Sequence, residues 1–446
     1  MTRTGTAAVL MAGLLAVIGT ACSDDADEGD AVSRDTSTTT TATGRPAGPS
    51  AALTPLTAGR GIDLVGINAP DLVAAGYVEE ELAAAGTATS YVGDLPADGM
   101  FDLEPGPTAD YRTRVVVRRP AAAADFNGTV VVEWLNVSAG LDAAPDFAFM
   151  ADELLRGGYA WVGVSAQRIG VEGGAAAVGV TGAPSGGIKT RDPERYGELV
   201  HPGDAFAYDI YTQVARALRD AGEVDALGGL VPERLLAVGE SQSAFALTTY
   251  VNGVQPLARA FDGFLIHSRG ASSAPLGRAG EGVDVAGSLG GPPTRIRTDS
   301  DAPVLTLETE SDVVGFFGYH RARQPDTDRF RLWEVAGTAH ADAYIVGPLA
   351  DALDCGGQIN TGPQHLVVKA ALRHLDTWVR TGEAPPPAEP FELDDTSGQT
   401  RLVRDGDGIV VGGIRTPLVD VPVATLSGEP HDSPSVICLL LGSTIP

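Results

Sequence analysis

The sequence contains little positive charge. Its 446 residues include 31 lysines and arginines against 58 aspartates and glutamates, a formal net charge of −27. A surface of this sign repels phosphate backbones and anionic lipid, so nucleic acid is not expected as a partner. Cysteine is also scarce: Cys22, Cys355 and Cys438 are the only three, and none lies at ligand spacing from another cysteine or a histidine. A zinc site is therefore not expected, and the sequence predicts no metal and no cofactor.

The apolar run near the N-terminus is short. Residues 7–18 follow Arg3 and precede three small residues, 19–21, which stand directly before Cys22. A membrane-spanning helix needs about 20 apolar residues, so a run of this length predicts a signal peptide. The small residues before Cys22 resemble a bacterial lipobox, which predicts a lipoprotein anchored by Cys22 to the outer face of the cell membrane. Plain secretion is the alternative. The membrane would be contacted through this lipid only.

Residues 23–60 are rich in Asp, Ser, Thr, Ala, Pro and Gly, and they predict a disordered linker outside the folded domain. If Cys22 carries lipid, Cys355 and Cys438 remain as an even pair in an oxidising compartment. We expect them to form a disulfide that ties the C-terminal tail to the domain. The alternative is two separate buried thiols.

From residue 61 onward, strand-like and helix-like segments alternate, without an internal repeat. Strands are predicted at 112–118 (an outer strand), 128–134, 159–165, 234–238, 260–267, 303–307 and 330–335, and helices at 146–156, 206–218 and 365–379. This rhythm is typical of the α/β class, with a mostly parallel central sheet and helices on both faces. Two insertions, near 170–203 and 270–300, and an irregular tail from about 384 complete the predicted domain of residues 61–446.

One serine stands where a nucleophile is expected. Ser241 lies in the stretch Gly-Glu-Ser-Gln-Ser, after the apolar strand 234–238 and before helix-compatible residues 244–250. A strand, a sharp turn and a helix form a nucleophile elbow, in which small residues two positions before and after the serine relieve backbone crowding. Gly239 meets this need, and Ser243 replaces the commoner glycine. The alternative interpretation is a serine that caps a helix.

A histidine and an acid follow Ser241 in the order found in α/β-hydrolases. His340 lies just after the strand 330–335, and Asp312 lies in the turn after the strand 303–307. Such an acid holds the imidazole in the tautomer that accepts the serine proton. Glu310, in the same turn, is the alternative acid. The oxyanion hole is expected from the backbone N–H of Gln242 and from Asn136 or its neighbour in the loop after 128–134.

Several stretches together resemble the exported bacterial "alpha/beta hydrolase domain" family. They are VVVEWLNVSAG (130–140), VGESQSAFALTTYVN (238–252), FDGFLIHSRG (261–270), ETESDV (308–313), WEVAGTAHAD (333–342), INTGPQHLVVKAALRHLDTWVRTG (359–382), GGIRTPLVDVP (412–422) and CLLLGST (438–444). The resemblance covers residues 60–446. It implies the α/β-hydrolase fold, Ser241 as nucleophile and His340 as base, and it leaves the acid open between Glu310 and Asp312.

The sequence thus predicts a serine hydrolase, with a small-molecule carboxylic ester as its substrate and an acyl-enzyme as its intermediate. An amidase or peptidase with the same triad is one alternative, and a non-catalytic ligand-binding surface lipoprotein is another. The insertions near 170–203 and 270–300 leave the carboxyl ends of strands, so they are expected to shape the pocket. Arg269 either meets an acidic group of the substrate or makes a structural salt bridge.

Overall fold

A parallel sheet lies at the centre of the fold in the computed structural model, which describes residues 44–64, 70–178, 186–433, 435 and 437–446. In these residues nine strands form one sheet in the order β1-β2-β3-β5-β4-β6-β7-β8-β9. The strands are β1 (Ala52–Pro55), β2 (Tyr77–Asp94), β3 (Asp102–Pro120), β4 (Thr129–Trp134), β5 (Ala160–Val164), β6 (Arg234–Glu240), β7 (Gly263–His267), β8 (Val304–Thr309) and β9 (Phe330–Val335). Strands β5 to β9 in this order are parallel, and β1, β2 and β3 are antiparallel to their neighbours.

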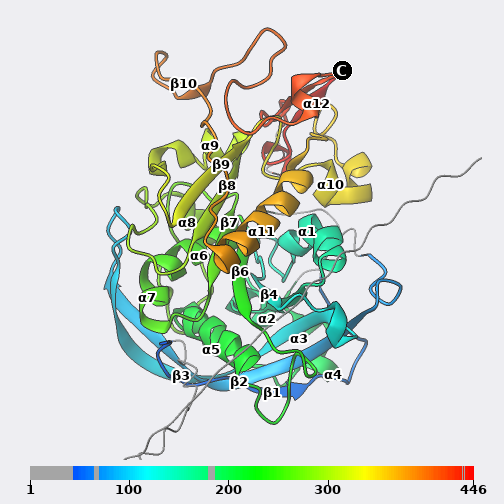
Figure 1. Ribbon diagram of the computed structural model, residues 1–446, viewed down its shortest axis with the longest axis vertical. Helices are drawn as coiled ribbons and strands as arrows, with labels where there is room; N and C mark the ends of the chain where they lie inside the picture. Colours follow the sequence, from blue (N-terminus) through cyan, green and yellow to red (C-terminus); the bar gives the residue numbers. More distant parts are fainter. Residues whose placement is uncertain (1–43, 65–69, 179–185, 434, 436) are drawn as a thin grey trace, which may run out of the picture. The chain divides into compact units, whose positions relative to one another are not determined.

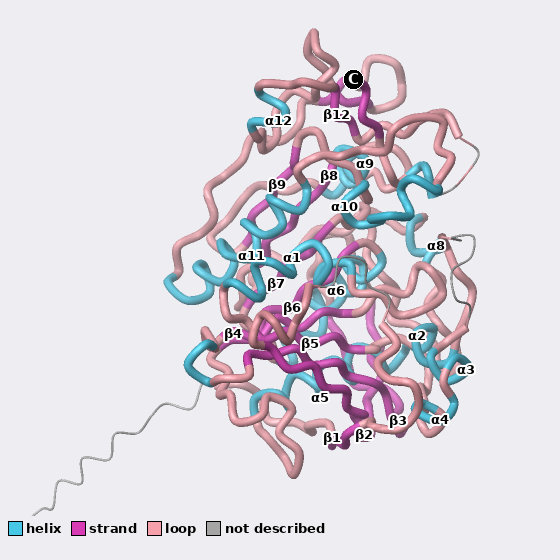
Figure 2. The backbone as a smooth tube through the Cα atoms, turned by 90° about the vertical axis from the view of Figure 1, so that its right-hand side faces the viewer, coloured by secondary structure: helices cyan, strands magenta, loops and turns pink. Residues whose placement is uncertain are grey.

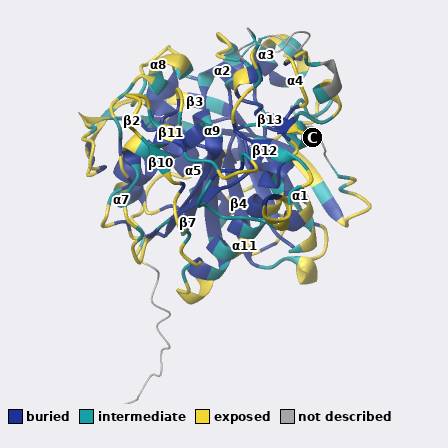
Figure 3. Cartoon of the chain, turned by 90° about the horizontal axis from the view of Figure 1, so that it is seen from above, coloured by how far each residue is buried: buried dark blue, intermediate teal, exposed yellow. Residues whose placement is uncertain are grey.

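The central strands are apolar because both faces of the sheet are covered. In β4, Val130 and Val132 pack into the core cluster that contains helix α5 (Ala207–Arg219), whereas Val131 packs against helix α1 (Pro145–Arg156) on the opposite face. Side chains alternate between faces along a strand, so a strand buried on both sides must be apolar throughout. Figure 3 shows the buried residues gathered along the central strands and the exposed ones in outer loops. The predicted mostly parallel sheet is confirmed.

Helices cover the two faces of the sheet. Helix α11 (Gln364–Thr381) lies beside α1, as Figures 1 and 2 show, and both pack on the face that carries Leu236 and Leu265. Helices α5 and α6 (Gln242–Thr249) pack on the other face. The remaining helices are α2 (Arg168–Glu172), α3 (Ile188–Arg191), α4 (Pro193–Tyr196), α7 (Gln255–Ala258), α8 (Val285–Leu289), α9 (Glu310–Val313), α10 (Ala343–Val346) and α12 (Pro417–Asp420).

The N-terminal part of the sheet differs from the prediction in two ways. Residues 112–118 belong to β3, which is an inner strand between β2 and β5, and not an outer strand. The linker predicted for 23–60 ends too late, because β1 pairs with β2 and buries Leu53. Both differences have one cause. Strand β2 is rich in Ala, Gly and Glu, which are poor strand formers, and it is held by its long pairing with β3 rather than by its own propensity.

The C-terminal tail returns to the domain. Strand β10 (Leu393–Asp394) pairs antiparallel with β11 (Arg401–Leu402), and β12 (Thr425–Ser427) pairs antiparallel with β13 (Ser443–Ile445). Between β12 and β13, the short 3₁₀ helix η6 (Ile437–Leu439) carries Cys438, which forms a disulfide with Cys355 across a Cα–Cα distance of 5.4 Å. The predicted pairing of these two cysteines is confirmed. Figure 2 shows the strand β12 at the same end of the molecule as α9 and β9.

The N-terminal segment was predicted to carry a signal peptide and a lipid anchor. Residues 1–43, which include Arg3 and Cys22, lie outside the described residues. Residues 45–446 form one compact unit. In the part of the chain that the structure describes, no helix is both long and apolar enough to span a bilayer.

Candidate active site

Ser241 stands on a sharp turn between a strand and a helix. It follows β6 directly and precedes the first residue of α6, with φ 56° and ψ −120°. A non-glycine residue with positive φ is strained, and such strain is kept where surrounding structure enforces it. Gly239 makes the turn possible, since a Cβ at that position would lie 3.0 Å from the Leu247 side chain and from the Ser243 Cβ. The turn therefore holds the Ser241 hydroxyl at the carboxyl end of the central sheet.

His340 links Ser241 to an acid. Its Nε2 lies 2.8 Å from the Ser241 Oγ, and its Nδ1 lies 2.6 Å from Oδ1 of Asp312. Each of the three follows the carboxyl end of a parallel strand: Ser241 follows β6, Asp312 lies in α9 directly after β8, and His340 lies in the loop after β9. Parallel strands end at the same edge of a sheet, so residues far apart in sequence meet there. The arrangement gives one continuous hydrogen-bonded row from hydroxyl to imidazole to carboxylate.

The Asp312 carboxylate is buried and well supplied with donors. Its Oδ2 accepts the Thr309 backbone N–H at 2.7 Å and the Thr309 hydroxyl at 2.6 Å. Burial alone would raise the pKa of Asp312, but the charge of His340 and the hydrogen bonds from His340 and Thr309 outweigh it, and the pKa is lowered. Asp312 is therefore held as a carboxylate, the form that fixes the Nδ1–H tautomer of the imidazole.

Glu310, the alternative acid, lies elsewhere. Its Oε1 accepts the backbone N–H of Gly337 at 2.7 Å, and its Oε2 accepts the N–H of Gly428 at 2.9 Å and binds Arg404 at 2.8 Å. Burial raises the pKa of Glu310, against the opposing charge of Arg404 and these hydrogen bonds. Glu310 thus joins the turn after β8 to the His340 loop and to the C-terminal tail. The structure places Asp312, and not Glu310, against the imidazole.

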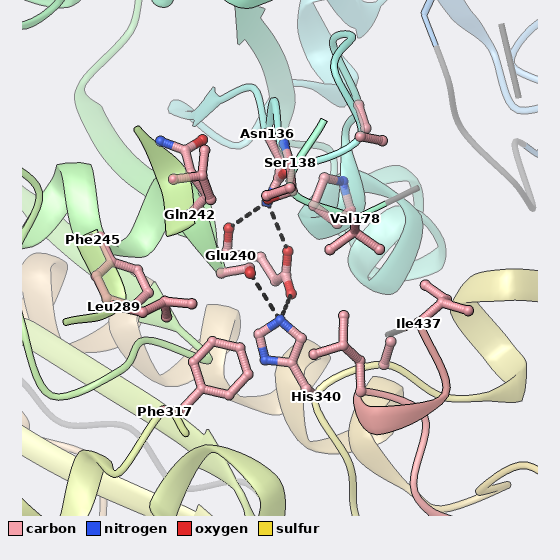
Figure 4. Close-up of a pocket in the computed structure, with 18 of the residues that line it drawn as sticks. Asn136, Ser138, Val178, Glu240, Gln242, Phe245, Leu289, Phe317, His340 and Ile437 are labelled. Carbon is pink, nitrogen blue, oxygen red and sulfur yellow. Dashed lines mark hydrogen bonds and ion pairs between the residues drawn. The ribbon is translucent and has the colours of Figure 1, made fainter. Parts of the chain in front are cut away.

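The His340 ring is held from several sides. Phe317 stacks on it, with the ring centroids 4.3 Å apart (Figure 4). The His340 backbone N–H donates to the Ser311 hydroxyl at 2.7 Å, and the next N–H, of Ala341, donates to Leu440 O at 2.9 Å. The histidine loop is therefore fixed by the acid turn on one side and by the C-terminal tail on the other.

Glu240 is a site residue that the sequence reasoning missed. Its Oε1 lies 3.4 Å from His340 Nε2, and its Oε2 accepts the Asn136 side-chain amide at 3.2 Å (Figure 4). Burial raises the pKa of Glu240 well above its ordinary value, and the nearby carboxyl groups of Asp146, Asp312 and Glu133 add to the effect. The available signal was a lone carboxyl group at the end of an apolar strand, directly before Ser241.

Gln242 and Asn136, the predicted oxyanion-hole donors, differ in whether their N–H groups already have acceptors. Gln242 is the first residue of α6, and the N–H at that position has no acceptor within the helix. Asn136 is committed to other partners: its backbone N–H donates to Ala143 O at 2.9 Å, and its side chain donates to Glu240 O at 3.0 Å. Its neighbour Val137 has an N–H that points toward Gln242 Oε1 at 3.4 Å. The N–H groups of Asn136 and the backbone N–H of Val137 thus already have acceptors within this loop or the elbow.

A cavity of about 460 Å³ opens beside Ser241 and His340. Residues of both insertions line it, among them Val178 from the first, and Ala274 and Leu289 from the second. The prediction that these insertions shape a pocket is thus met by residues on both. Ligand-binding pockets commonly measure about 300–1,000 Å³, so the cavity has the size of a small-molecule site.

Arg269 and His267 are not among the residues that line the cavity. Arg269 is buried, and its guanidinium donates to the carbonyl oxygens of Gly270, Ala271 and Thr294, so it has a structural place and does not face a substrate. His267 bonds through its ring to Asp146 at 2.8 Å and to Gln364 at 3.0 Å. Among the described residues, no group of His, Cys, Asp and Glu side chains is arranged to hold a metal ion.

The chain is similar to several solved structures. Among solved structures, it is similar to an α/β serine hydrolase without a lid from Xanthomonas campestris, with 10% identity over 65% of this chain and 94% of that one and a TM-score of 0.32. It is also similar to fungal esterases from Rhizomucor miehei, with 11% identity over 67% and 85% of the two chains and a TM-score of 0.31. No curated protein sequence matches it.

The family assignment comes from sequence. A model of the alpha/beta hydrolase domain family matches residues 39–446, a range that contains every described residue. The match confirms the resemblance and the α/β-hydrolase fold class predicted above, and the chain belongs to the alpha/beta hydrolase domain family.

Proposed function

We propose that this protein is a serine hydrolase that cleaves carboxylic esters through an acyl-enzyme on Ser241. The observation that carries the proposal is the hydrogen-bonded row Ser241–His340–Asp312, which ends at an apolar cavity. A serine hydroxyl is a weak nucleophile at neutral pH and needs an adjacent base, which in turn needs a group to orient it. In this proposal His340 is the base, and Asp312 is the group that orients it.

The proposed reaction begins at the Ser241 hydroxyl. Its oxygen attacks the ester carbonyl carbon while His340 Nε2 takes the proton, and Asp312 stabilises the resulting imidazolium through Nδ1–H. The oxyanion of the tetrahedral intermediate accepts the N–H of Gln242 and a second N–H from the loop that follows β4. One such donor contributes about 3–4 kcal/mol of transition-state stabilisation. The intermediate collapses to the acyl-enzyme, and His340 returns its proton to the departing alcohol. Water then attacks the acyl-enzyme by the same route.

A fluorophosphonate probe tests the nucleophile. We expect it to label the wild-type protein and not Ser241→Ala, because an activated serine displaces fluoride from the probe and becomes phosphonylated. The matched control is Ser243→Ala, which removes a buried hydroxyl two residues away and should still be labelled. Absence of labelling in the wild type would contradict the proposal and would favour a ligand-binding protein without catalysis.

The same protein tests the bond that is cleaved. We expect hydrolysis of 4-nitrophenyl esters and at least about a hundredfold lower kcat/KM for the matched 4-nitroanilides, since an amide is the poorer acyl donor. Comparable rates on the two series would replace the esterase with an amidase or peptidase that uses the same triad.

We also propose that the chain is exported and carries lipid on Cys22. The apolar run 7–18 and the small residues before Cys22 support this, and the Cys355–Cys438 disulfide is of the kind that persists in oxidising compartments. Metabolic labelling with a radioactive fatty acid is expected to mark the wild-type protein and not Cys22→Ala. A soluble mature chain without label would indicate plain secretion.

A further inference from the structure

We infer that the cavity beside Ser241 takes the acyl chain of an uncharged, apolar ester, and that the C-terminal turn η6 is the wall that sets how long this chain can be. The inference rests on the proposed function and adds the class of substrate to it. It is carried by the composition of the cavity wall and by the contacts that hold the tail in place.

The cavity wall is largely apolar. Its large side chains come from segments that are distant in the sequence: Phe149 of α1, Phe245 of α6, Leu289 of α8, Phe317 of the loop after α9, and Ile437 of η6. Figure 4 shows Phe245, Leu289, Phe317 and Ile437 arranged around His340. Burial of an apolar chain against such a wall is favourable, by about fourfold in binding for each methylene group.

The cavity offers nothing to an anionic group. Among the described residues that line it there is no lysine or arginine, and its only ionisable side chains are Glu240 and His340. Glu240 is a carboxyl group that accepts the Asn136 side-chain amide, so it offers no positive charge to a substrate carboxylate. An ionised group moved from water to an apolar site without a partner is strongly disfavoured. A substrate with a charged acyl chain is therefore excluded by the same residues that favour an apolar one.

The turn η6 forms the wall on the C-terminal side. Ile437 and Leu439 line the cavity, and Cys438 between them is fixed to Cys355 by the disulfide. Leu440 lines the cavity too, and its carbonyl oxygen accepts the N–H of Ala341, the neighbour of His340. The wall is thus anchored on both sides, and its position relative to the base is fixed. A side chain on η6 is accordingly in a position to limit chain length.

An ester panel tests the inference. We expect kcat/KM to rise from 4-nitrophenyl acetate through butyrate to hexanoate, by about fourfold per methylene. The 4-nitrophenyl monoester of adipic acid has as many acyl carbons as the hexanoate but ends in a carboxylate, and we expect its kcat/KM to be at least about 100-fold lower. Acetate as the best substrate, or an adipate monoester within tenfold of the hexanoate, would overturn the inference.

Two variants locate the wall. Ile437→Trp fills the cavity from η6, so the ratio of kcat/KM for hexanoate to that for acetate should fall at least tenfold. Leu418→Trp makes the same kind of change on α12, at a residue that is 45% exposed and outside the cavity, and should leave the ratio unchanged. Thermal melting shows whether Ile437→Trp is folded. If folded Ile437→Trp keeps the wild-type ratio, η6 is not the selecting wall.

Failure of this inference and failure of the proposed function give different results. If the protein reacts with the fluorophosphonate probe at Ser241 but prefers short or anionic esters, the proposed function stands and the inferred substrate class is wrong. If Ser241 is not labelled, the proposed function itself is wrong.

Discussion

Two carboxyl groups two residues apart have separate tasks in this site. Asp312 orients the imidazole, whereas Glu310 accepts backbone N–H groups of Gly337 and Gly428 and pairs with Arg404. Both residues lie on the short helix α9. Residues two positions apart on a helix point in different directions, so the two carboxyl groups meet different partners. The two side chains should therefore differ in what their removal does to catalysis and to stability.

Replacement of Asp312 by asparagine should lower kcat by about 10⁴-fold, as expected when the acid of a triad can no longer select the imidazole tautomer. The matched change Glu310→Gln should lower kcat by less than tenfold. It should instead reduce the free energy of unfolding by about 2 kcal/mol, since a charge-assisted hydrogen bond to Arg404 is lost. Steady-state hydrolysis of an ester and urea unfolding of both variants measure the two effects.

The opposite pattern, with Glu310→Gln inactive and Asp312→Asn active, would assign the role of the acid to Glu310. Equal loss of kcat in both would indicate that the three-residue turn 310–312 acts as one structural unit, and that the division proposed here is wrong.

Glu240 adds a second carboxyl group on the other side of the imidazole. It stands 3.4 Å from His340 Nε2, the atom that takes the Ser241 proton in the proposed mechanism. A neutral carboxyl group there leaves the imidazole free to act as a base, and the raised pKa of Glu240 favours the neutral form. The protonation state of Glu240, the residue before Ser241, therefore matters for the proposed mechanism.

At the scale of elements, the C-terminal tail supports the histidine loop. Asn360, which precedes α11, donates from its side chain to Gly337 O at 3.1 Å and to Ser427 O at 2.9 Å. Its backbone N–H donates to Leu441 O at 3.2 Å. One buried amide thus joins the loop after β9 to the tail segments around β12 and η6. The tail is accordingly part of the site and not an appendage to it.

The disulfide should add to stability through this tail. It closes a loop between cysteines 83 residues apart in sequence, and the loss of chain entropy in the unfolded state corresponds to about 4 kcal/mol. We expect the double variant Cys355→Ser, Cys438→Ser to lose up to this amount in urea unfolding. A dithiothreitol-treated wild type is the companion sample and should unfold at the same urea concentration as the variant.

An unchanged unfolding midpoint in the variant would mean that the contacts of Asn360 and Glu310 hold the tail without the covalent link. Retained reactivity of Ser241 toward the fluorophosphonate probe in the same variant would show that the disulfide acts on the tail rather than on the elbow.

At the scale of the whole molecule, several buried carboxyl groups have raised pKa values. Burial is the largest cause for Glu133, Glu240 and Glu308, and it raises the pKa of Asp342 to about 7. A group of this kind keeps its proton in the folded state at a pH where the unfolded chain has lost it. Stability therefore falls as pH rises from the unfolded pKa to the folded one.

We accordingly expect a higher melting temperature at pH 5 than at pH 7.5. Asp342→Asn should reduce this difference, because asparagine does not titrate and can still cap α10 by accepting the Ile345 N–H. The window for Asp342 is about pH 4 to 7, from its unfolded pKa to its folded pKa. Melting curves of both proteins, measured across pH 4.5–8, test the expectation.

Measurements in high salt distinguish the effect of the buried carboxyl groups on stability from the effect of surface charge. The net charge of −27 also destabilises the folded state at neutral pH, but salt screens exposed charges far more than buried ones. Asp342→Asn should therefore flatten the pH dependence in high salt as well. A pH dependence that high salt abolishes in the wild type would assign it to the surface, and the buried carboxyl groups would have no part in it.

Much of the scaffold could be predicted from the sequence because the signals are local. The β-branched run in β4 and the apolar run in β6 are strands by composition, and the helix predicted at 365–379 corresponds to α11 (Gln364–Thr381). Gly239 and the strand–serine–helix context predicted the elbow, and strand ends placed His340 and the acid turn. Strand β2 escaped prediction, since its residues favour no strand and its pairing partner decides its conformation.

The sequence by itself determined the class of fold, the elbow serine, the histidine loop and the turn that holds the acid, because each depends on residues next to one another in the chain. Only the tertiary structure decided which carboxyl group meets His340, that Glu240 points at the imidazole, and that the tail closes an apolar cavity. Each of these depends on where side chains from distant segments converge, and that convergence is set by the packing of the sheet, the helices and the tail rather than by any local pattern.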